Sequence, residues 1–136
     1  MNLISCVDDG LGLRFNHRRQ SRDKMLAQHI LRRTGGEIWL HPDSAKLFAD
    51  WPDAVLHVIS SPEEVPEGAW CFWESPVSPA LRPEKILLYH WNRVYPADEL
   101  FVYPGGQDRW ECLESTDFSG FSHPKITEEV LISKEV

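Results

Sequence analysis

The sequence predicts a single α/β domain over residues 1–136, with a mixed central sheet that is parallel in its first half and antiparallel in its C-terminal strands. Two patterns support this fold class. In the first half, apolar segments alternate with segments of helical spacing, as in parallel strands joined by right-handed crossovers. In the second half, apolar segments follow one another with only turns between them, which favours antiparallel pairing. A chain of 136 residues with six Trp, six Phe and three Tyr can bury one core.

The first strand and the first helix are predicted from apolar spacing and capping residues. Residues 2–7 are apolar and end at an Asp-Asp-Gly turn, so we expect a buried strand there. Ser21 is a suitable N-cap for a helix over residues 22–33, whose apolar residues recur at helical spacing. Gly35-Gly36 is expected to end this helix.

Three further strands and a short helix complete the predicted first half. Residues 37–40 form the second strand, and Pro42 opens a short helix, since proline is favoured at the first helical position. Residues 54–59 form a third strand rich in β-branched side chains. Residues 69–73 are apolar throughout, so this fourth strand is expected to be buried on both faces.

The predicted second half begins with a proline-rich loop over residues 75–83. Residues 85–91 form the fifth strand, residues 98–102 a brief extended segment and residues 109–113 the sixth strand. Residues 126–133 alternate in polarity with a period of two, which favours a strand, although the paired glutamates would also suit a helix.

Buried side chains are predicted among the aromatic residues and the cysteines. We expect Trp39, Phe72 and Trp91 to lie in the core, on the second, fourth and fifth strands. The cysteines stand alone in apolar stretches, without metal-ligand or disulfide spacing, and are expected to be reduced and packed as small apolar groups. They are Cys6, Cys71 and Cys112.

Charge is unevenly distributed along the chain. Residues 1–33 carry seven Lys/Arg against three Asp/Glu, whereas residues 34–136 carry seven against eighteen, and the formal net charge is −7. Residues 14–22, with four arginines and a histidine, are expected to form a basic loop above an acidic body, suited to a small anionic ligand or a protein partner. The acidic body argues against nonspecific nucleic-acid binding.

The chain carries no targeting or membrane signal that we can identify. No apolar run approaches the roughly 20 residues that span a bilayer. The first residues have no basic region and are interrupted by two aspartates, unlike a secretory signal. We therefore expect no membrane partner and a cytoplasmic location.

Three stretches carry a resemblance to a known family. Residues 3–23 give an apolar strand, an acidic residue, a Gly-containing loop and a helix that begins near a carboxylate. Residues 34–48 give a Thr-Gly helix end, an apolar strand and a helix that begins at a serine. Residues 84–101 give a late strand and an Asp-x-x-Phe step, followed by Trp110 and Phe118. This pattern resembles dihydrofolate reductase in degenerate form, and implies that fold for most of the chain.

The chain departs from that family where the family binds its ligands. Arg-Arg-Gln-Ser at residues 18–21 replaces the family's Pro-Trp, and the resemblance implies that Asp23 corresponds to the carboxylate that holds the pterin ring. Residues 41–44 replace the Gly-Arg-x-Thr that binds cofactor phosphate. Trp73-Glu74 replaces the Gly-Gly that lets the backbone approach the diphosphate. We therefore expect that NADPH does not bind, and we expect no other cofactor.

A second resemblance involves two short motifs. Phe-Asn-x-Arg-Arg-Gln-Ser at residues 15–21 and Gly-x-Ser-His-x-Lys-Ile-Thr at residues 120–127 are similar to small clostridial proteins labelled ribonuclease Z. The tRNA-processing enzyme of that name depends on His-x-His-x-Asp-His to hold two zinc ions. No two of the six histidines here lie closer than twelve residues apart, so neither a metal site nor metal-dependent hydrolysis is expected.

Candidate ligand-binding residues gather in the basic segment and after the predicted strands. Guanidinium groups offer charged, bidentate donors to phosphate or carboxylate, and open sheets place their sites at the carboxyl ends of parallel strands. The ligand-binding candidates are Asp8, Asp9, Asn16, Arg18, Arg19, Gln20, Arg22 and Asp23. The secondary candidates are Asn92, Arg93, Ser122, His123 and Lys125.

Structural roles are the alternative for these candidates. The arginines could pair with surface acids, and the first strand's aspartates could cap a turn or pair with Arg18 or Arg19. Ser122 beside His123 is not a triad, because adjacent side chains rarely face each other and spacing places no acid beside them.

Three functions remain open at this point. The first is a reductase-like protein that binds a ligand or partner without hydride transfer. The second is an enzyme that reuses the old pocket on a pterin- or nucleotide-like anion, which requires a concave cavity lined by Asp8, Asp23 and Arg18. The third is an inhibitor or immunity-type protein whose acidic face, residues 43–74, covers a basic target. A pocket closed by aromatic side chains would favour the third over the second.

Overall fold

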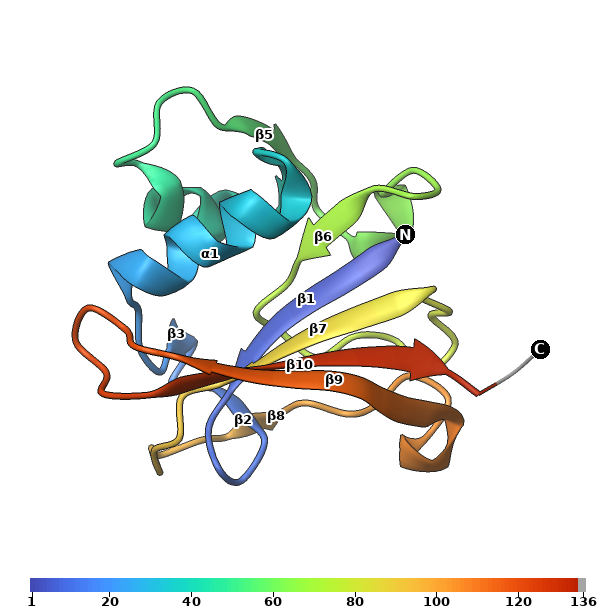
Figure 1. The fold of residues 1–136 in the computed structure, drawn as a ribbon. Coiled ribbons are helices and arrows are strands. Elements are labelled where there is room, and N and C mark those ends of the chain that lie inside the picture. The colour runs from blue at the N-terminus through green and yellow to red at the C-terminus, as the bar shows by residue number, and fades with distance from the viewer. Residues whose placement is uncertain (135–136) are drawn as a thin grey trace.

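A computed structural model describes residues 1–134 as a mixed seven-stranded sheet with a small second sheet beside it (Figure 1). The large sheet contains β1 (Asn2–Val7), β4 (Glu37–Leu40), β5 (Val55–Val58), β6 (Trp70–Phe72), β7 (Lys85–His90), β9 (Trp110–Phe118) and β10 (Ile126–Ser133). The second sheet contains β2 (Gly12–Phe15), β3 (Arg18–Arg19) and β8 (Glu99–Leu100). The helical elements are α1 (Lys24–Thr34) and the 3-10 helices η1 (Pro42–Phe48), η2 (Pro62–Glu64) and η3 (Gln107–Arg109).

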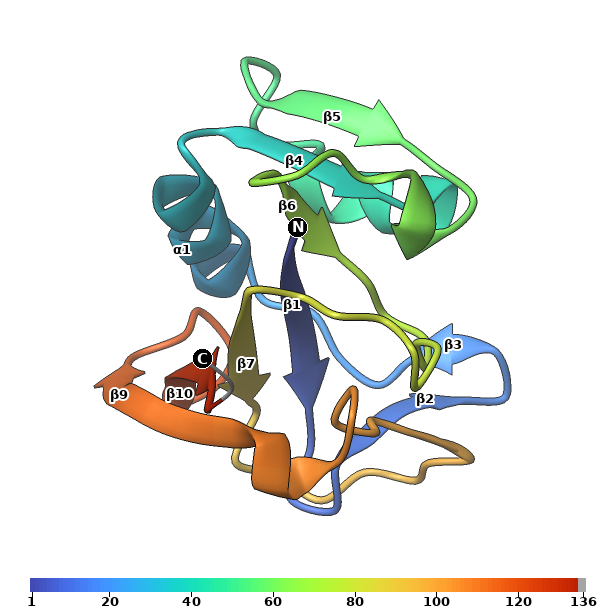
Figure 2. The same cartoon turned by 90° about the vertical axis from the view of Figure 1, so that its right-hand side faces the viewer.

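Strand pairing confirms the predicted fold class. The strand order is β5-β4-β6-β1-β7-β10-β9, which in Figure 2 runs from β5 at the top to β1 in the centre and then to β9 at the lower left. Every neighbouring pair from β5 to β7 is parallel. β10 runs antiparallel to both β7 and β9, so the C-terminal segment is a strand, as its period of two predicted. The sixth strand reaches Phe118 instead of ending at residue 113, because β9 pairs with β10 along its whole length.

The start of the first helix differs from the prediction. The N-cap of α1 is Asp23, whose carboxylate accepts hydrogen bonds from the backbone N–H groups of Met25 and Leu26. Ser21 lies outside the helix, because its hydroxyl is engaged elsewhere. The predicted end is confirmed, since Gly35 caps the helix in the left-handed conformation with φ 68°.

Apolar side chains cover both faces of the central part of the large sheet. On one face α1 and η1 cover Phe72 and Trp91, which are 2% and 5% exposed, as predicted. On the other face Leu3, Leu88 and Trp110 pack under the second sheet. Trp39 is only partly buried, contrary to the prediction, because its ring lies beside an outer strand and stacks on His57 with 4.2 Å between ring centroids.

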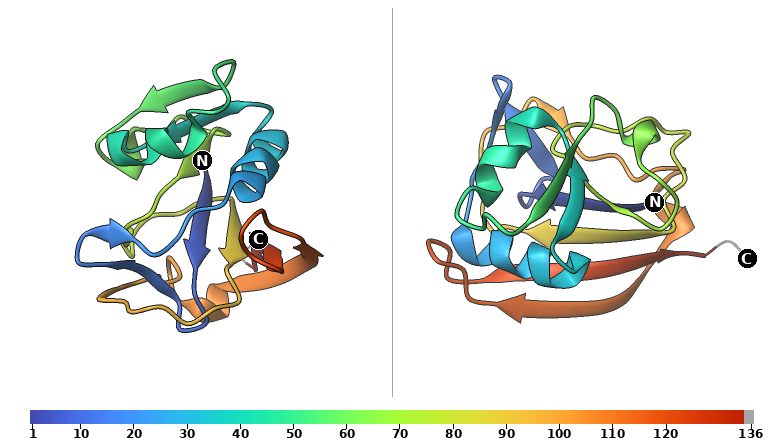
Figure 3. Two further views of the ribbon diagram at one scale, coloured as in Figure 1. Left: turned by 90° about the vertical axis from the view of Figure 1, so that its left-hand side faces the viewer. Right: turned by 90° about the horizontal axis from the view of Figure 1, so that it is seen from above.

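The basic segment is a β-hairpin, whereas the sequence predicted a loop. β2 and β3 pair antiparallel, and β8 adds to the other edge of β2. Asn16 and His17 form the turn with φ of 54° and 62°, the left-handed pair that matches the twist of a two-residue hairpin. The hairpin lies beyond the carboxyl end of β1 (Figures 1 and 3).

A buried acidic residue ties α1 to the C-terminal strands. Glu128 is 1% exposed and accepts hydrogen bonds from Arg33 at 2.5 and 3.0 Å and from the Tyr89 hydroxyl at 2.7 Å. His29 Nε2 lies 2.9 Å from the same carboxylate. A helix and a strand therefore supply the hydrogen-bond partners that a buried carboxylate requires.

No helix within residues 1–134 is long and apolar enough to cross a membrane.

Candidate functional site

Most of the predicted site residues lie either in the segment 14–23 or directly after the parallel strands of the large sheet. Asp8 follows β1, Trp73-Glu74 follows β6, and Trp91 follows β7. The segment from β3 to the start of α1 passes beside these ends, and its residues line a pocket together with side chains from β1 and β6. This is the edge at which open α/β sheets place their sites.

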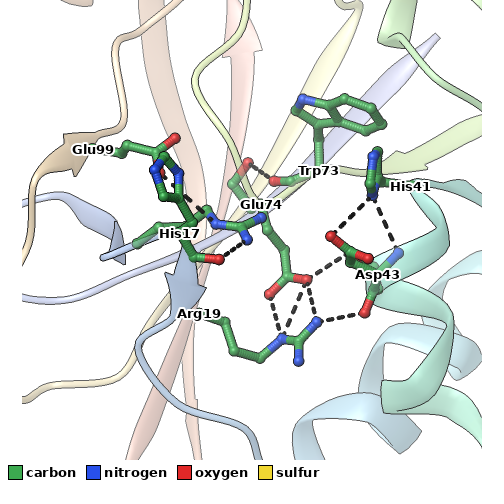
Figure 4. Close-up of polar contacts among 10 residues, drawn as sticks. His17, Arg19, His41, Asp43, Trp73, Glu74 and Glu99 are labelled. Atoms are coloured by element: carbon green, nitrogen blue, oxygen red, sulfur yellow. Dashed lines mark hydrogen bonds and ion pairs between the residues drawn. The ribbon is translucent and has the colours of Figure 1, made fainter.

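Arg19 and Glu74 form a clasp between the hairpin and the large sheet. The guanidinium donates to the Glu74 carboxylate at 3.0 Å from both Nε and Nη2, and Nη2 also donates to the Asp43 carbonyl at 2.7 Å (Figure 4). The Ser44 hydroxyl donates to Glu74 Oε1 at 2.6 Å. The clasp therefore joins β3, the start of η1 and the segment after β6, and its hydrogen bonds raise the pKa of Arg19.

Asp8 organises the turn between β1 and β2. It is 2% exposed and accepts hydrogen bonds from the backbone N–H groups of Gly10, Gly12 and Tyr95 at 2.7–3.0 Å and from Gln20 Nε2 at 3.2 Å. Burial alone would raise the pKa of Asp8, but these hydrogen bonds outweigh it and hold the pKa below its ordinary value. The pairing with Arg18 or Arg19 that the sequence left open does not occur for either aspartate, because the clasp takes Arg19 and Asp9 points to solvent.

Asp23, His123 and Ser21 form a hydrogen-bonded chain. His123 Nδ1 lies 2.9 Å from Asp23 Oδ2, and His123 Nε2 lies 3.0 Å from Ser21 Oγ. The Tyr95 hydroxyl is 3.2 Å from the same Nε2, and the imidazole packs on Trp91 with 4.7 Å between ring centroids. The backbone N–H groups of residues 121 and 122 also donate to Asp23, each at 2.8 Å.

The hydrogen bonds to Asp23 keep its carboxylate ionised. Burial alone would raise its pKa, but the bonds from the 121–123 segment and from α1 outweigh burial and hold the pKa far below its ordinary value. A charged Asp23 favours a proton on His123 Nδ1, which leaves Nε2 to accept a proton from a hydroxyl. The same bonds occupy the oxygens that, by resemblance, would face a pterin ring.

Beside this chain lie an enclosed pocket and an open groove. The enclosed pocket is lined by Phe48, Phe72 and Trp91 below the segment 19–23, and leaves about 20 Å³ for the centre of a water-sized molecule, room for roughly one water. The open groove, which we call the cationic groove, is lined by Arg14, His17, Arg18, Arg19, Ser21, Arg22, Asp43 and Lys46. Within residues 1–134, the guanidinium groups of Arg18 and Arg22 make no hydrogen bond or ion pair.

Other predicted residues form hydrogen bonds that join neighbouring segments of the chain. The backbone N–H of Asp9 donates to the Arg93 carbonyl at 2.9 Å. Asn92 donates from Nδ2 to the Lys125 carbonyl and to the Thr127 hydroxyl, which ties the end of β7 to the start of β10. Asn16 lies in the hairpin turn, where its backbone N–H donates to Asp98.

The cysteines are free, as the sequence predicted, but Cys112 is exposed, contrary to the prediction that all three pack as small apolar groups. Burial raises the pKa of Cys71 to about 12 and raises that of Cys6, which lines the enclosed pocket. Among the residues that the structure describes, no three His, Cys, Asp or Glu side chains are grouped to hold a metal ion.

Sequence reasoning missed Ser21 and Tyr95 as members of this site. Ser21 was assigned to the helix cap, and its partner His123 is 102 residues away, a separation that no local pattern reveals. The motifs at residues 15–21 and 120–127 each contain one of the two residues. Only the folded structure shows that the two motifs meet at the His123 imidazole.

The fold that carries this site is that of dihydrofolate reductase. The chain superimposes on dihydrofolate reductase from Enterococcus faecalis, solved in complex with NADP(H) and RAB-propyl, with a TM-score of 0.64 over 98% of this chain and 96% of that one. The two sequences are 8% identical, so the likeness establishes the fold. No protein-family model matches the sequence, and neither does any curated protein.

Proposed function

We propose that this protein binds a small anionic ligand in the cationic groove and does not transfer hydride from a dinucleotide. The observation that carries the proposal is the pair of guanidinium groups of Arg18 and Arg22, which line one groove. Within residues 1–134 neither has an ion-pair partner, although Asp43 also lines the groove, whereas neighbouring Arg19 is paired with Glu74. Like charges that share a groove repel each other, weakly in bulk water and more strongly near a protein surface. An anion between such groups relieves this repulsion and gains charge-assisted hydrogen bonds.

The Arg19–Glu74 clasp supports the absence of a dinucleotide. By resemblance, cofactor phosphates would lie at the start of the helix after β4 and against glycines after β6. At the start of the helix after β4, the Ser44 hydroxyl already donates a hydrogen bond to Glu74. After β6, the residues are Trp73 and Glu74 instead of glycines. A phosphate would meet a carboxylate and an indole, so both charge and volume oppose it.

An enzyme that reuses the old pocket has less support. The enclosed pocket has room for roughly one water, and Phe48, Phe72 and Trp91 are among the residues that narrow it. Asp8 and Asp23, the acids that such an enzyme would present, have their oxygens engaged by backbone N–H groups. This closure favours, as a second candidate, a protein whose acidic face over residues 43–74 covers a basic partner.

Thermal-shift screening against phosphates, carboxylates and NADPH, followed by calorimetry, tests the proposal. A ligand at 100 times its Kd stabilises the protein by about 2.7 kcal/mol. We expect a phosphate or carboxylate to raise the Tm and NADPH to leave it unchanged. The double variant Arg18→Ala/Arg22→Ala should abolish the shift, while Arg32→Ala, an exposed arginine at the other end of α1, should retain it. Micromolar NADPH binding, or a shift indifferent to Arg18 and Arg22, would contradict the proposal.

A further inference from the structure

We propose that Ser21 and His123 are the nucleophile and general base of an esterase site, with Asp23 as the positioning residue, and that this site cleaves carboxylic esters that carry a negative charge. The preference for negative charge rests on the proposed function of the cationic groove, whereas the nucleophile does not. Ester cleavage would be an activity distinct from both hydride transfer and simple ligand binding.

The distances place each group in its role. Ser21 Oγ is 3.0 Å from His123 Nε2, and Asp23 Oδ2 is 2.9 Å from His123 Nδ1. A serine nucleophile requires a base within this range, and the base requires a third group that fixes its tautomer and orientation. Here the three groups come from two segments about 100 residues apart, and burial of Asp23 and His123 keeps water from competing.

Ser21 is accessible while its partners are not. Its side chain is partly exposed and lines the cationic groove, whereas His123 is 5% and Asp23 8% exposed. The backbone is fixed on both sides of Ser21, by the Arg19–Glu74 clasp before it and by the Asp23 cap of α1 after it. A hydroxyl held in this way can meet a substrate in the groove without a rearrangement of the fold.

Tyr95 shares the imidazole nitrogen with Ser21. Its hydroxyl lies 3.2 Å from His123 Nε2, slightly farther than Ser21 Oγ. The nitrogen has one lone pair, so the two hydroxyls compete for it. Tyr95→Phe should therefore leave the reactivity of Ser21 unchanged or increase it, which separates Tyr95 from the catalytic pair.

The reaction balances with water as the only co-reactant. Ser21 Oγ attacks the ester carbonyl and its proton passes to His123 Nε2; the carbon–oxygen bond to the alcohol then breaks, and the alcohol leaves with that proton. Water, deprotonated by the same nitrogen, attacks the acyl-serine, and the acid departs as Oγ recovers its proton. Arg22, which lines the groove with Ser21, supplies positive charge for the anionic intermediate.

A fluorophosphonate probe tests the nucleophile directly. Intact-mass analysis should show one adduct on the full-length protein, mapped to Ser21, and none on Ser21→Ala. Ser122→Ala is the matched control, because Ser122 lies on the Nδ1 side of the same imidazole, and this variant should be labelled like the parent. No adduct, or equal labelling of parent and Ser21→Ala, would overturn the proposal.

A cysteine substituted for Ser21 tests the role of His123 without a fluorophosphonate probe. At pH 7, the thiol introduced by Ser21→Cys should be alkylated by iodoacetamide at least about tenfold faster than the exposed Cys112 of the same molecule, because His123 promotes the thiolate. Adding His123→Gln should abolish the advantage. A thiol no faster than Cys112 would show that His123 does not act as a base.

Hydrolysis of 4-nitrophenyl succinate and 4-nitrophenyl acetate separates the two proposals. We expect Ser21→Ala to abolish cleavage of both esters, and Arg18→Ala, which leaves Arg22 in place for the intermediate, to slow only the anionic succinate. If cleavage depends on Ser21 but shows no preference for the succinate, Ser21 is still the nucleophile and the proposed role of the cationic groove is wrong. Cleavage of both esters that survives Ser21→Ala would overturn the nucleophile.

Discussion

Asp8 and Asp9 are adjacent in the chain but have opposite environments. Asp8 is buried and accepts four hydrogen bonds, whereas the side chain of Asp9 is exposed. The Asp-Asp-Gly sequence identified a turn after the first strand, but it did not distinguish the two residues. Only Asp8 faces the N–H groups of the turn and of Tyr95, a segment more than 80 residues away.

Asp8→Asn should destabilise the protein by about 1–3 kcal/mol or more, because an amide nitrogen would face donors that now meet a carboxylate oxygen. Asp9→Asn is the matched control and should stay within about 0.5 kcal/mol of the parent. Urea unfolding measures both values. Equal stabilities of the two variants would show that Asp8 does not hold the turn.

The buried Glu128 carboxylate should make the stability of the protein depend on pH. Burial alone would raise its pKa, but the hydrogen bonds from His29, Arg33 and Tyr89 outweigh it and lower the pKa from an ordinary 4.5 to about 2. A lowered folded-state pKa contributes stability that is complete above pH 4.5 and is lost as the pH falls towards 2.

Glu128→Gln should therefore cost about 3 kcal/mol near pH 6, the lower end of the range for a broken buried ion pair, since Arg33 is partly exposed and can regain water. The difference in unfolding free energy between parent and variant should shrink between pH 4.5 and pH 2. Asp8 and Asp23 titrate in both proteins, so their effects cancel from this difference. A difference that stays constant over this interval would contradict the assigned ionisation.

At the scale of elements, periodicity predicted the strands of the large sheet, while tertiary contacts decided the rest. Residues 37–40 were predicted within their observed limits because residues 38–40 are apolar, and the Ile38 and Leu40 side chains are buried in the fold. The β2–β3 hairpin was missed because β3 is a two-residue strand of arginines with no apolar pattern. The start of α1 was misplaced because Ser21 and Asp23 are both good capping residues, and only the folded structure shows that Asp23 accepts the hydrogen bonds of the first helical N–H groups.

The hairpin yields a prediction about two adjacent arginines. Arg19→Ala leaves Glu74, whose side chain is 11% exposed, with Ser44 as its remaining partner and should cost about 1–3 kcal/mol. Arg18→Ala removes an exposed side chain and should change stability by less than about 0.5 kcal/mol. Thermal unfolding of both variants measures this contrast. If Arg18→Ala were the more destabilising, the clasp would not be the contact that holds the hairpin.

For the whole molecule, element order was enough to predict the fold, although the chain is 8% identical to the dihydrofolate reductase on which it superimposes. The site could be predicted only in part. The residues after β1 and in the basic hairpin were identified from charge, since uneven charge is visible in a sequence. The chain from Ser21 through His123 to Asp23 was not identified, because it depends on the 119–125 segment closing over the start of α1.

We propose that in this protein the cationic groove, which suits an anion, takes the place of a dinucleotide site. The most direct measurement is an NMR titration of the arginine Nε–Hε and tryptophan indole resonances with inorganic phosphate and, separately, with NADPH, at constant ionic strength. We predict that phosphate shifts Arg18 and Arg22 saturably and leaves Arg32 unchanged, and that NADPH does not shift the Trp73 indole. Saturable NADPH shifts at Trp73, with Arg18 and Arg22 unaffected by phosphate, would contradict the proposed anion site.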